Sequence, residues 1–417
     1  MRICVLGGGV VGVASAYYLA REGHSVTLLE AREGLALETS LANGAQLSYS
    51  YVAPLADPAV LPKLPGWLLN RDSPLRFVPS LDPHQWRWCL AFLRACRSDV
   101  ARAVTAELLG LGYHSRALVH DLVTREKLDF DYQRNGKLVV YRDPAAFAGA
   151  RRQLDYQAGL GSSQQALDGA ACVALEPVLA QLGDRLAGGI HTPSEDAGDC
   201  HAFSTKLAEL TGQRYGARFH CGERVTGLRR EGRAVVAVRT EGGEIEADAF
   251  VIAAGMGSVP LLAQLGLRLP MYPLTGYSLT APVVSGRHRP PGISITDLHH
   301  KVVYARLGQR LRIAGMVDLA GRHPRADRRR IALLARQARE TFPDSADFDA
   351  ATAWCGSRPA TPDSKPLIGA TPYANLWLNT GHGALGFTLA CGSAALLADA
   401  IAGRPAPLDA AAFALAR

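Results

Sequence analysis

The chain has 417 residues, of which 48% are hydrophobic and 20% are charged, a composition typical of a soluble globular protein with room for two domains. Its net charge of +7 comes from dispersed basic residues without a lysine-rich block, so we predict no nucleic-acid partner and a surface suited to anionic substrates or acidic lipid. Beyond the opening segment, no run of about 18 apolar residues predicts a membrane span.

The first predicted element allows two incompatible interpretations. The opening stretch MRICVLGGGVVGVASAYYLA has the basic residue and apolar run of a secretory signal, but also the strand, glycine turn and helix of a nucleotide-binding unit. Four glycines interrupt the apolar run, and no convincing small-residue cleavage site follows it. The strand Arg2–Leu6, the helix Val10–Glu22 that stops at Gly23, and the second strand Ser25–Leu29 all favour the nucleotide.

The pattern G-x-G-x-x-G joins the first strand to the first helix. Gly7 allows the tight turn, Gly9 lets the backbone approach a pyrophosphate, and Gly12 lets the helix pack against the strand. Phosphates would lie at the positive end of the helix dipole, and Glu30, which ends the second strand, is placed to accept hydrogen bonds from a ribose. The residues expected to bind the dinucleotide here are Gly7, Gly9, Val10, Val11, Gly12, Glu30, Ala31 and Arg32.

The next part of the chain departs from a simple nucleotide-binding fold. After a polar segment and a proline-rich passage, apolar residues repeat at helical spacing over 85–127. A strand is predicted over 137–141, and a further helical region over about 144–182. These elements form an insertion between two parts of the nucleotide-binding fold.

The nucleotide-binding pattern resumes after this insertion. Asp199 is expected near the N-terminus of a helix that leads to a strand over 217–221. The buried strand over 248–255 ends in the small residues Ala254 and Gly255, which let the backbone crowd a bound nucleotide. Alternating segments then predict a second, antiparallel sheet before a glycine-rich C-terminal part.

The predicted fold class is therefore α/β (α+β), with a Rossmann-like FAD-binding domain interleaved with a substrate domain built on an antiparallel sheet with helices. Residues 1–85, 188–262 and 345–417 are expected to form the FAD-binding domain, and 86–187 and 263–344 the substrate-binding domain. This interleaving argues against a NAD dehydrogenase with two consecutive domains. It fits a flavoprotein in which discontinuous segments hold one FAD.

Cysteine usage indicates the compartment. The eight cysteines include no C-x-x-C pair, and Cys4 lies in the predicted buried strand, which indicates a reduced, cytosol-facing protein. The adjacent pairs Cys200-His201 and His220-Cys221 do not have metal-ligand spacing, so no metal site is predicted. We expect a cytoplasmic protein, with peripheral contact to the cytoplasmic face of the inner membrane as an alternative.

Five motifs that follow one another along the chain carry a family resemblance. They are ETSLANGAQLS, SEDAGDCHAFS, YPLTGYSLTAPV, GSRPATPDSKPLIG and NLWLNTGHGALGFTLACGSAALLADAIAGRPAP. Together they resemble the small subunit of bacterial D-amino acid dehydrogenase, a relative of D-amino-acid oxidase and glycine oxidase. The resemblance implies non-covalent FAD, hydride transfer from the Cα of a D-amino acid to flavin N5, and an imino acid that hydrolyses to a 2-oxo acid and ammonia. It also implies a quinone or other electron acceptor in place of oxygen.

The same resemblance implies roles for single residues. Glu30 would hold the adenosine ribose, and Val225 would contact the adenine through its backbone. A helix beginning near Thr388 would point its positive end at the flavin N1–C2=O locus, where negative charge develops on reduction. The residues implied at the pyrophosphate and flavin are Ser40, Asn43, Gly44, Ala45 and Gln46, and those around the isoalloxazine are Gly381, Gly383, Leu385, Gly386 and Thr388.

Four residues could have catalytic roles. Arg358 matches the arginine that clamps the substrate carboxylate in glycine oxidase-like relatives, and the alternative is a structural arginine that closes a turn. Tyr277 and Tyr304 lie on predicted strands of the second sheet, where they could face the substrate or pack in the core. His382, between two glycines, could be catalytic or structural.

The chain departs from the family pattern at several positions. The family usually has Ala-Gly where this chain has Gly44-Ala45, so a methyl group replaces a hydrogen near the cofactor. The family also typically has Lys at Thr275, Trp at Phe387 and Gly at Ser364. The first two of these differences could alter the substrate pocket.

Other functions on the same fold stay open as alternatives. They are a glycine- or sarcosine-type oxidase, a D-hydroxyproline dehydrogenase, and a flavin-binding accessory subunit without activity of its own. Tryptophan and arginine beside apolar faces in 67–69 and 86–94 could also place the protein on a membrane surface, where a quinone is reached. We favour an ordinary amphipathic core helix for these segments.

Overall fold

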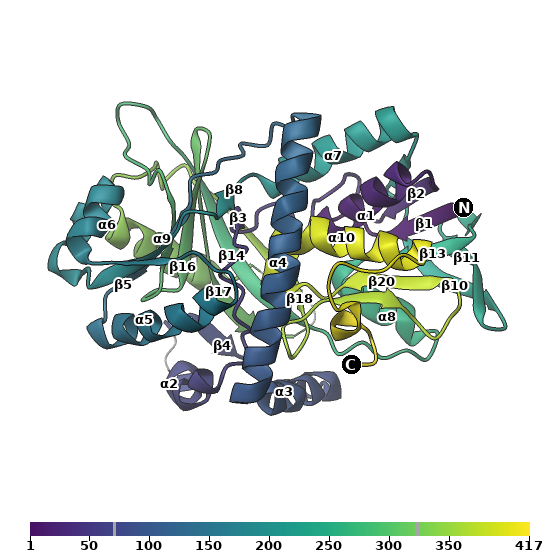
Figure 1. Cartoon of the computed structure of the whole chain (residues 1–417), viewed down its shortest axis with the longest axis horizontal. Helices are drawn as coiled ribbons and strands as arrows, with labels where there is room; N and C mark the ends of the chain where they lie inside the picture. The colour runs from purple at the N-terminus through teal and green to yellow at the C-terminus, as the bar shows by residue number, and fades with distance from the viewer. Residues whose placement is uncertain (70–71, 322–325) are drawn as a thin grey trace.

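The computed structural model describes residues 1–69, 72–321 and 326–417, and two large sheets lie side by side in it (Figure 1). The opening stretch folds as the nucleotide-binding interpretation predicted, with β1 (Arg2–Leu6), a glycine turn, α1 (Val10–Arg21) and β2 (Ser25–Glu30). Gly23 follows α1 with φ +86°, the left-handed conformation of a helix C-terminal cap.

The first sheet has six strands and continues the β1–β2 pair on both sides. Its other strands are β9 (Arg218–Cys221), β13 (Ala249–Ile252), β19 (Leu367–Ala370) and β20 (Leu376–Thr380). The order is β19-β20-β13-β1-β2-β9, and every pair is parallel except β19 with β20. Such a doubly covered parallel sheet is the Rossmann-like architecture that the sequence predicted.

Alternation along β1 assigns the two faces of this sheet. Ile3 and Val5 pack in the apolar cluster formed with the helices α1, α4 (Ser98–Glu126), α7 (Cys200–Tyr215) and α10 (Gly386–Ala402). Cys4 and Leu6 pack on the other face. The cover there is a three-stranded sheet of β10 (Val225–Glu231), β11 (Ala234–Thr240) and β12 (Gly243–Glu246), together with α8 (Ser258–Ala263).

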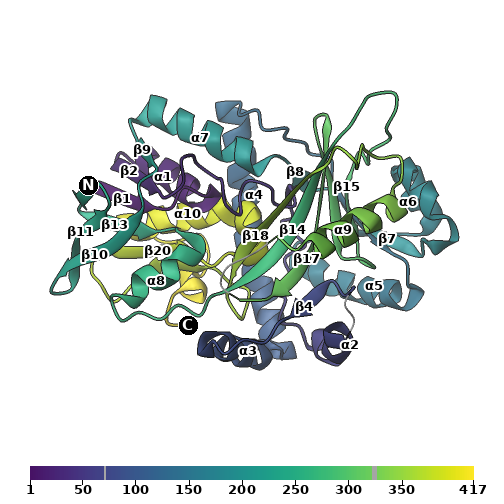
Figure 2. The ribbon, with the colours of Figure 1, turned by 180° about the vertical axis from the view of Figure 1, so that it is seen from behind.

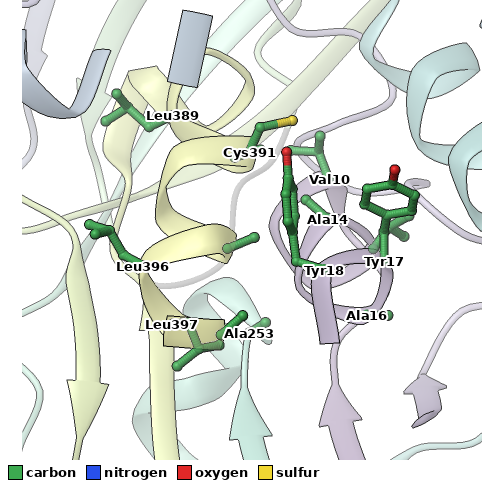
Figure 3. Packing of buried hydrophobic residues seen from close by; sticks show 14 of the residues in the cluster. Val10, Ala14, Ala16, Tyr17, Tyr18, Ala253, Leu389, Cys391, Leu396 and Leu397 are labelled. Atoms are coloured by element: carbon green, nitrogen blue, oxygen red, sulfur yellow. The ribbon is translucent and has the colours of Figure 1, made fainter. Parts of the chain in front are cut away.

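Small residues let the helices of this layer approach closely. Figure 3 shows Ala14 and Tyr18 of α1 against Cys391 of α10, with Ala253 at the end of β13 nearby. On the opposite side of α10, a Cβ at Gly392 would lie 3.0 Å from the carbonyl oxygen of Leu111 in α4. The start of α10 is therefore held in a fixed position by α1 and α4.

One described helical stretch, Gly383–Ala402, is long and apolar enough to cross a membrane. However, 61% of it is buried inside the molecule, where α10 packs against α1 and α4. Its composition therefore matches its place in the core.

The second sheet has nine strands. They are β4 (Leu75–Phe77), β5 (Lys137–Tyr141), β6 (Gln165–Leu167), β7 (Gly188–Thr192), β14 (Tyr272–Pro282), β15 (Ser294–Asp297), β16 (Val302–Leu307), β17 (Arg310–Leu319) and β18 (Thr352–Ala360). The order is β18-β14-β17-β16-β15-β5-β7-β6, with β4 beside β17. Two of its pairs, β15 with β5 and β17 with β4, are parallel, so the expected antiparallel sheet is in fact mixed.

Helices surround the nine-stranded sheet on its outer side. Figure 2 shows α9 (Arg328–Thr341) across the face of β14 and β17. Two short strands, β3 (Gln46–Leu47) and β8 (Asp196–Ala197), pair between the two sheets. The remaining helices are α2 (Leu64–Leu69), α3 (Pro83–Ala95), α5 (Pro144–Gly159) and α6 (Gly169–Leu175).

Strand pairing differs from the predicted domain boundaries at three places. β4, β7 and β18 were expected in the FAD-binding domain, within 1–85, 188–262 and 345–417, but all three belong to the nine-stranded sheet. A short apolar strand does not encode which of two sheets it will join, and the boundaries drawn from the sequence were wrong there. The helical region expected over 144–182 also contains the strand β6.

Candidate active site

The turn between β1 and α1 requires its glycines. Gly7 has φ +110°, and a Cβ on it would lie 2.6 Å from the carbonyl oxygen of Ala253. A Cβ on Gly12 would lie 1.9 Å from the carbonyl oxygen of Gly7. Ala254, the next residue after Ala253, contacts the same turn, since its Cα would be 2.7 Å from a Cβ on Gly7. Ala253 and Ala254, which directly follow β13, therefore lie against this turn.

The N-terminus of α1 is open for an anion. Gly9 is the N-cap and has no side chain to cap the helix, and a Cβ on it would meet only Ser40 Oγ, at 3.5 Å. Val10 N donates a hydrogen bond of 3.1 Å to Ser40 Oγ. The N–H groups of Val11 and Gly12, which have no partner inside the helix, can then serve a phosphate.

Glu30 lies where the ribose of a dinucleotide is expected. Its carboxylate accepts hydrogen bonds from Gly8 N at 2.6 Å and from Arg32 N at 2.8 Å. Two further lone pairs are available for ribose hydroxyls. Glu223 N donates to the carbonyl oxygen of Glu30 at 2.8 Å, which brings Val225 at the start of β10 to the same corner. Ala31 lies between Glu30 and Arg32 in the loop that follows β2.

The Asn43–Gln46 segment is attached to the nine-stranded sheet. Arg312, 4% exposed, donates from Nη1 to the carbonyl oxygen of Asn43 at 2.8 Å, and Asn43 Oδ1 accepts from Ala45 N at 3.0 Å. A Cβ on Gly44 would lie 3.1 Å from Val303 Cγ2 in β16. The exchange of Gly and Ala relative to the family pattern leaves Ala45 in a left-handed conformation, with φ +57°.

The C-terminal loop meets the end of β18. Gly381 and Gly383 have φ of +80° and +55°, and His382 between them forms a bridge with Ala360. Leu385 is the N-cap of α10, which starts at Gly386 and has no side-chain cap. The first turn of α10 also contains Thr388, whose Oγ1 accepts a hydrogen bond of 3.1 Å from Ser48 N.

His382 has a structural environment. It is 3% exposed, and its Nε2 lies 3.0 Å from Ser393 Oγ in α10. Burial lowers the pKa of His382 to about 3, so its ring is neutral at physiological pH. A neutral ring bonded within the loop supports the structural interpretation of this residue.

Arg358 projects from β18 toward the same region. It is half-buried, and the one hydrogen bond of its side chain to a described residue runs from Nη1 to the carbonyl oxygen of Met316, at 3.1 Å. Burial lowers the pKa of Arg358 to about 10, and the nearby Asp318 carboxylate opposes that shift. The guanidinium is thus charged, positioned by one bond, and has further N–H donors for a carboxylate.

A β-bulge aims the Met316 carbonyl at Arg358. Thr275 and Tyr277 of β14 pair with Asp318 and Gly315 of β17, so two residues of β17 lie opposite one residue of β14. Met316, one of these two, has φ +63°, which is unusual for a residue with a side chain. Strain of this kind persists where the surrounding structure fixes it, here beside the candidate substrate arginine.

Both candidate tyrosines lie on the opposite face of the sheet. Tyr277 is 2% exposed and donates to Asp318 Oδ2 at 2.9 Å. Tyr304 is fully buried, with its ring edge-on to Phe342 at 4.9 Å. Both pack in the apolar cluster under α9, whereas their neighbours on the other face reach the flavin-side segment: Ser278 Oγ donates to the carbonyl oxygen of Ala42 at 2.7 Å. We therefore do not retain the tyrosines as substrate contacts.

Three segments distant in the sequence converge at this place. Thr39 Oγ1 donates to the carbonyl oxygen of Ser357 at 2.7 Å, which joins the segment before Asn43 to β18. The Ala360–His382 bridge joins β18 to the loop before α10. Gln46 Nε2 donates to the carbonyl oxygen of Ile295 at 3.3 Å on β15. The segment 39–46, β18, β15 and the loop before α10 therefore meet between the two sheets.

The residues present fit a FAD molecule that spans this region. At the glycine turn a Cβ on Gly7 or Gly12 would meet backbone atoms, and a Cβ on Gly383 would meet no atom within 4 Å. FAD needs an acidic residue for its ribose, a helix start for its pyrophosphate and a second helix start for its isoalloxazine. Glu30, the start of α1 and the start of α10 fit these three needs.

The class of protein that this fold and site define is a flavin-dependent oxidoreductase. Residues 2–400 match the family described as FAD dependent oxidoreductase, and the chain belongs to that family, whose cofactor is FAD. The resemblance drawn from the motifs is confirmed by curated relatives. The chain is 54% identical over 413 residues to D-amino acid dehydrogenase 2 of Pseudomonas aeruginosa, with 98% of this chain and 96% of the relative covered. It is 50% identical over 430 residues to D-amino acid dehydrogenase 2 of Ralstonia nicotianae, with 100% of both covered.

Solved structures share the fold at lower identity. Glycine oxidase from Geobacillus kaustophilus superposes with a TM-score of 0.78 at 21% identity, covering 100% of this chain and 99% of that one. L-amino acid deaminase from Proteus vulgaris superposes with a TM-score of 0.76 at 17% identity, covering 100% and 96%. The predicted α/β class with a Rossmann-like cofactor domain is confirmed.

The departures from the family pattern have different settings. Phe387 packs among Phe130 and Phe203 in the helical core, with ring centres 6.4 and 5.6 Å away, so this difference concerns packing. Ser364 is left-handed, with φ +68°, at a position where the family typically has Gly. Thr275 is 3% exposed and pairs with Asp318 of β17 and Ser357 of β18 in the bulged part of the sheet.

Two buried cationic residues were not identified from the sequence as parts of the site. Arg312 binds the segment that would contact the flavin, at Asn43, and Lys137 binds Ser48, which follows that segment. Neither has a motif around it: Arg312 is one of many arginines, and Lys137 begins an apolar strand. Only the cross-strand partners found in the structure reveal them.

Proposed function

We propose that the protein is a FAD-dependent D-amino acid dehydrogenase, which converts a D-amino acid to an imino acid that water hydrolyses to a 2-oxo acid and ammonia. The observation that carries the proposal is the half-buried Arg358 guanidinium beside the segments that fit the flavin. The names of the relatives at 54% and 50% identity support the substrate class.

FAD, when bound, supplies the two-electron acceptor for the hydride that leaves the substrate Cα. Arg358 would pair with the substrate carboxylate through two N–H groups, since the structure commits one of its donors to Met316. A fixed carboxylate leaves the amine, the side chain and the Cα–H bond to be arranged around one carbon. Only one enantiomer then directs its Cα–H bond to the flavin while its side chain occupies the available space.

No side chain needs to remove a proton if the amine enters neutral, so positioning is the main contribution of the protein. Burial of Arg358 strengthens its attraction for the carboxylate, because fewer water molecules compete. The Met316 carbonyl keeps the guanidinium from rotating away when no substrate is bound.

Spectra of the purified yellow protein test this proposal. We expect anaerobic addition of single D-amino acids to bleach the flavin absorbance, and the matching L-amino acids to leave it unchanged. Bleaching by L-amino acids, or by glycine or sarcosine alone, would contradict the D-amino acid assignment and favour the related oxidases. Turnover of the single chain with an artificial dye is also expected; a bleachable protein that needs a second chain for turnover would be an accessory subunit.

For the electron acceptor we propose a quinone-type compound. The relatives are named dehydrogenases, and the motif resemblance implies a membrane quinone. The reduced protein is expected to be reoxidised faster by a soluble quinone analogue than by air-saturated buffer. Stoichiometric oxygen consumption with peroxide formation during turnover would show an oxidase instead.

We also propose peripheral contact with an anionic lipid surface through α3. Its inner face packs in the core, with Trp88 and Phe92 stacked at 5.4 Å, as the core-helix interpretation requires. Its outer face is apolar and exposed: Trp86, Leu90 and Leu93 are 51%, 50% and 46% exposed. Those three residues lie at i, i+4 and i+7 and form one ridge.

Charge and position favour lipid as the occupant of this α3 ridge. Arg87 and Arg94 are exposed on the same helix and can meet lipid phosphates. Leu81, just before the helix, is fully exposed. Figures 1 and 2 show α3 at the outer edge of the molecule, at the same edge as α2. The side chains of Trp67, Leu68 and Leu69, part of the same hypothesis, lie outside the described residues.

Vesicle flotation tests the α3 ridge. The double variant Leu90→Ser/Leu93→Ser is expected to lose binding to vesicles that contain anionic lipid, while Leu175→Ser/Val284→Ser, which changes two exposed apolar residues elsewhere, keeps it. Trp88 is left unchanged because its indole N–H donates to the carbonyl oxygen of Ala360 at 2.8 Å. Equal flotation of both variants and the wild type would exclude this surface.

A further inference from the structure

Lys137 is a buried cation that the proposed reaction does not yet use. It is the first residue of β5 and is 3% exposed. Its Nζ donates a hydrogen bond of 2.8 Å to Ser48 Oγ and lies 4.2 Å from the centre of the Tyr51 ring. Burial of an ammonium group costs free energy unless the group is paired, so the partners of Lys137 indicate its role.

Those partners lead to the start of α10. Ser48, 6% exposed, donates from its backbone N to Thr388 Oγ1 at 3.1 Å. Thr388 lies in the first turn of α10, the helix start that fits the flavin, and Ser48 follows closely after the Asn43–Gln46 segment. A hydrogen-bonded path of two links therefore joins the buried ammonium group to the helix start.

A buried carboxylate accompanies the lysine. Glu195 is fully buried, and its Oε1 accepts from Ser50 N at 2.7 Å, two residues beyond Ser48. Gly136 N donates to the carbonyl oxygen of Glu195 at 3.0 Å, which places Glu195 beside Lys137. Burial raises the pKa of Glu195 and lowers that of Lys137, and each residue opposes the shift of the other.

We propose that Lys137 is a positioning residue of the oxidation: it holds Ser48 against Thr388, and its positive charge favours the reduced, negatively charged state of the cofactor. Glu195 moderates that charge. The inference rests on the proposed function only in requiring FAD at this site, and not on which amino acid is oxidised.

The midpoint potential of the bound flavin, measured without any amino acid, tests the charge. In Lys137→Met the potential is expected to fall, by an amount equivalent to about a tenfold change in the equilibrium between oxidised and reduced cofactor, or about 30 mV for two electrons. In Glu195→Gln the potential is expected to rise, because the lysine charge is no longer compensated. Opposite signs distinguish a charge effect from loosened packing, which would move both variants in the same direction.

Lys206→Met is the matched control, since it removes a lysine charge from α7, where Lys206 pairs with the exposed Asp129 at 3.7 Å. Its potential is expected to equal that of the wild type. Should Lys137→Met fail to fold, Glu195→Gln still decides the matter. An unchanged or lowered potential in Glu195→Gln, or an unchanged potential in folded Lys137→Met, overturns the proposal. A yellow protein that shows these shifts but oxidises no D-amino acid would refute the proposed function and leave the role of Lys137 standing.

Discussion

A Cβ atom on Gly276 would lie 2.3 Å from Nη2 of Arg358, so the guanidinium occupies the space that a side chain on β14 would otherwise fill. Gly276 lies in the bulged part of the sheet, between Thr275 and Tyr277. Arg358 can adopt this conformation because Gly276 has no side chain.

Gly276→Ala is expected to displace the Arg358 side chain and leave the fold intact, because the clashing atoms are the end of a flexible side chain. KM for the amino acid should rise about tenfold or more, since one charge-assisted pair is weakened. Steady-state kinetics and the flavin spectrum together measure this. Gly315→Ala, in the neighbouring strand β17, is the control, and equal KM values in both variants would contradict the assigned role of Gly276.

Arg358→Met is expected to raise KM by about 10- to 100-fold, the range for loss of a charge-assisted pair, while the protein stays yellow. Arg358→Lys should recover only part of this, because an ammonium group cannot form the two parallel bonds of a guanidinium. Kinetics with the substrate identified by bleaching provide the measurement. An unaltered KM in Arg358→Met would refute the carboxylate clamp.

Two glycines in α4 should respond to alanine in opposite directions. A Cβ on Gly110 would meet no atom within 4 Å, so Gly110→Ala should stabilise the protein by about 0.5–1 kcal/mol through helix propensity. A Cβ on Gly112 would lie 2.6 Å from the carbonyl oxygen of Tyr49, which is backbone, so Gly112→Ala should destabilise by about 1–3 kcal/mol. Urea unfolding with excess FAD measures both, and effects of the same sign would contradict this account of α4.

His382 should contribute to the acid sensitivity of the fold. The pKa of its folded form, about 3, lies below the ordinary value of 6.5, so the unfolded chain binds the proton first as pH falls. The free energy of unfolding therefore falls as the pH drops from 6.5 to about 3, by up to about 1.4 kcal/mol for each pH unit.

His382→Asn removes this titration. Relative to the wild type, the variant should gain about 2 kcal/mol of unfolding free energy between about pH 7.5 and about pH 5, measured by urea unfolding with excess FAD. Parallel stability curves for the two proteins would show that His382 can accept a proton in the folded state.

The glycine turn could be predicted from the sequence because its geometry depends on residues close together in the chain. Gly7 and Gly12 contact each other and the end of β13, and no other residue type fits there. Arg358 could be predicted as a candidate through the motif around it. Its neighbours Gly276 and Met316 could not, since they are brought to it by pairing of β14, β17 and β18.

Tyr277 and Tyr304 show a second limit of the sequence. Alternation along a strand predicts that Tyr277 and Ser278 face opposite sides, but it does not tell which side holds the cofactor. The side that faces the cofactor depends on which face of the sheet α9 covers, and α9 is a separate element that follows β14 and β16 in the chain. The same reason accounts for β7 and β18, whose sheet is decided by partners rather than by their own residues.

The order in which the strands pair has a consequence for biosynthesis. Ile3 pairs with Ala249, and Phe250 pairs with Leu376, so strands that are far apart in the order of synthesis belong to one sheet. The sheet keeps an incomplete edge until β20 has been synthesised, which exposes the nascent chain to misassembly and favours chaperone assistance. For the same reason no single cut divides this polypeptide into two independently folding halves.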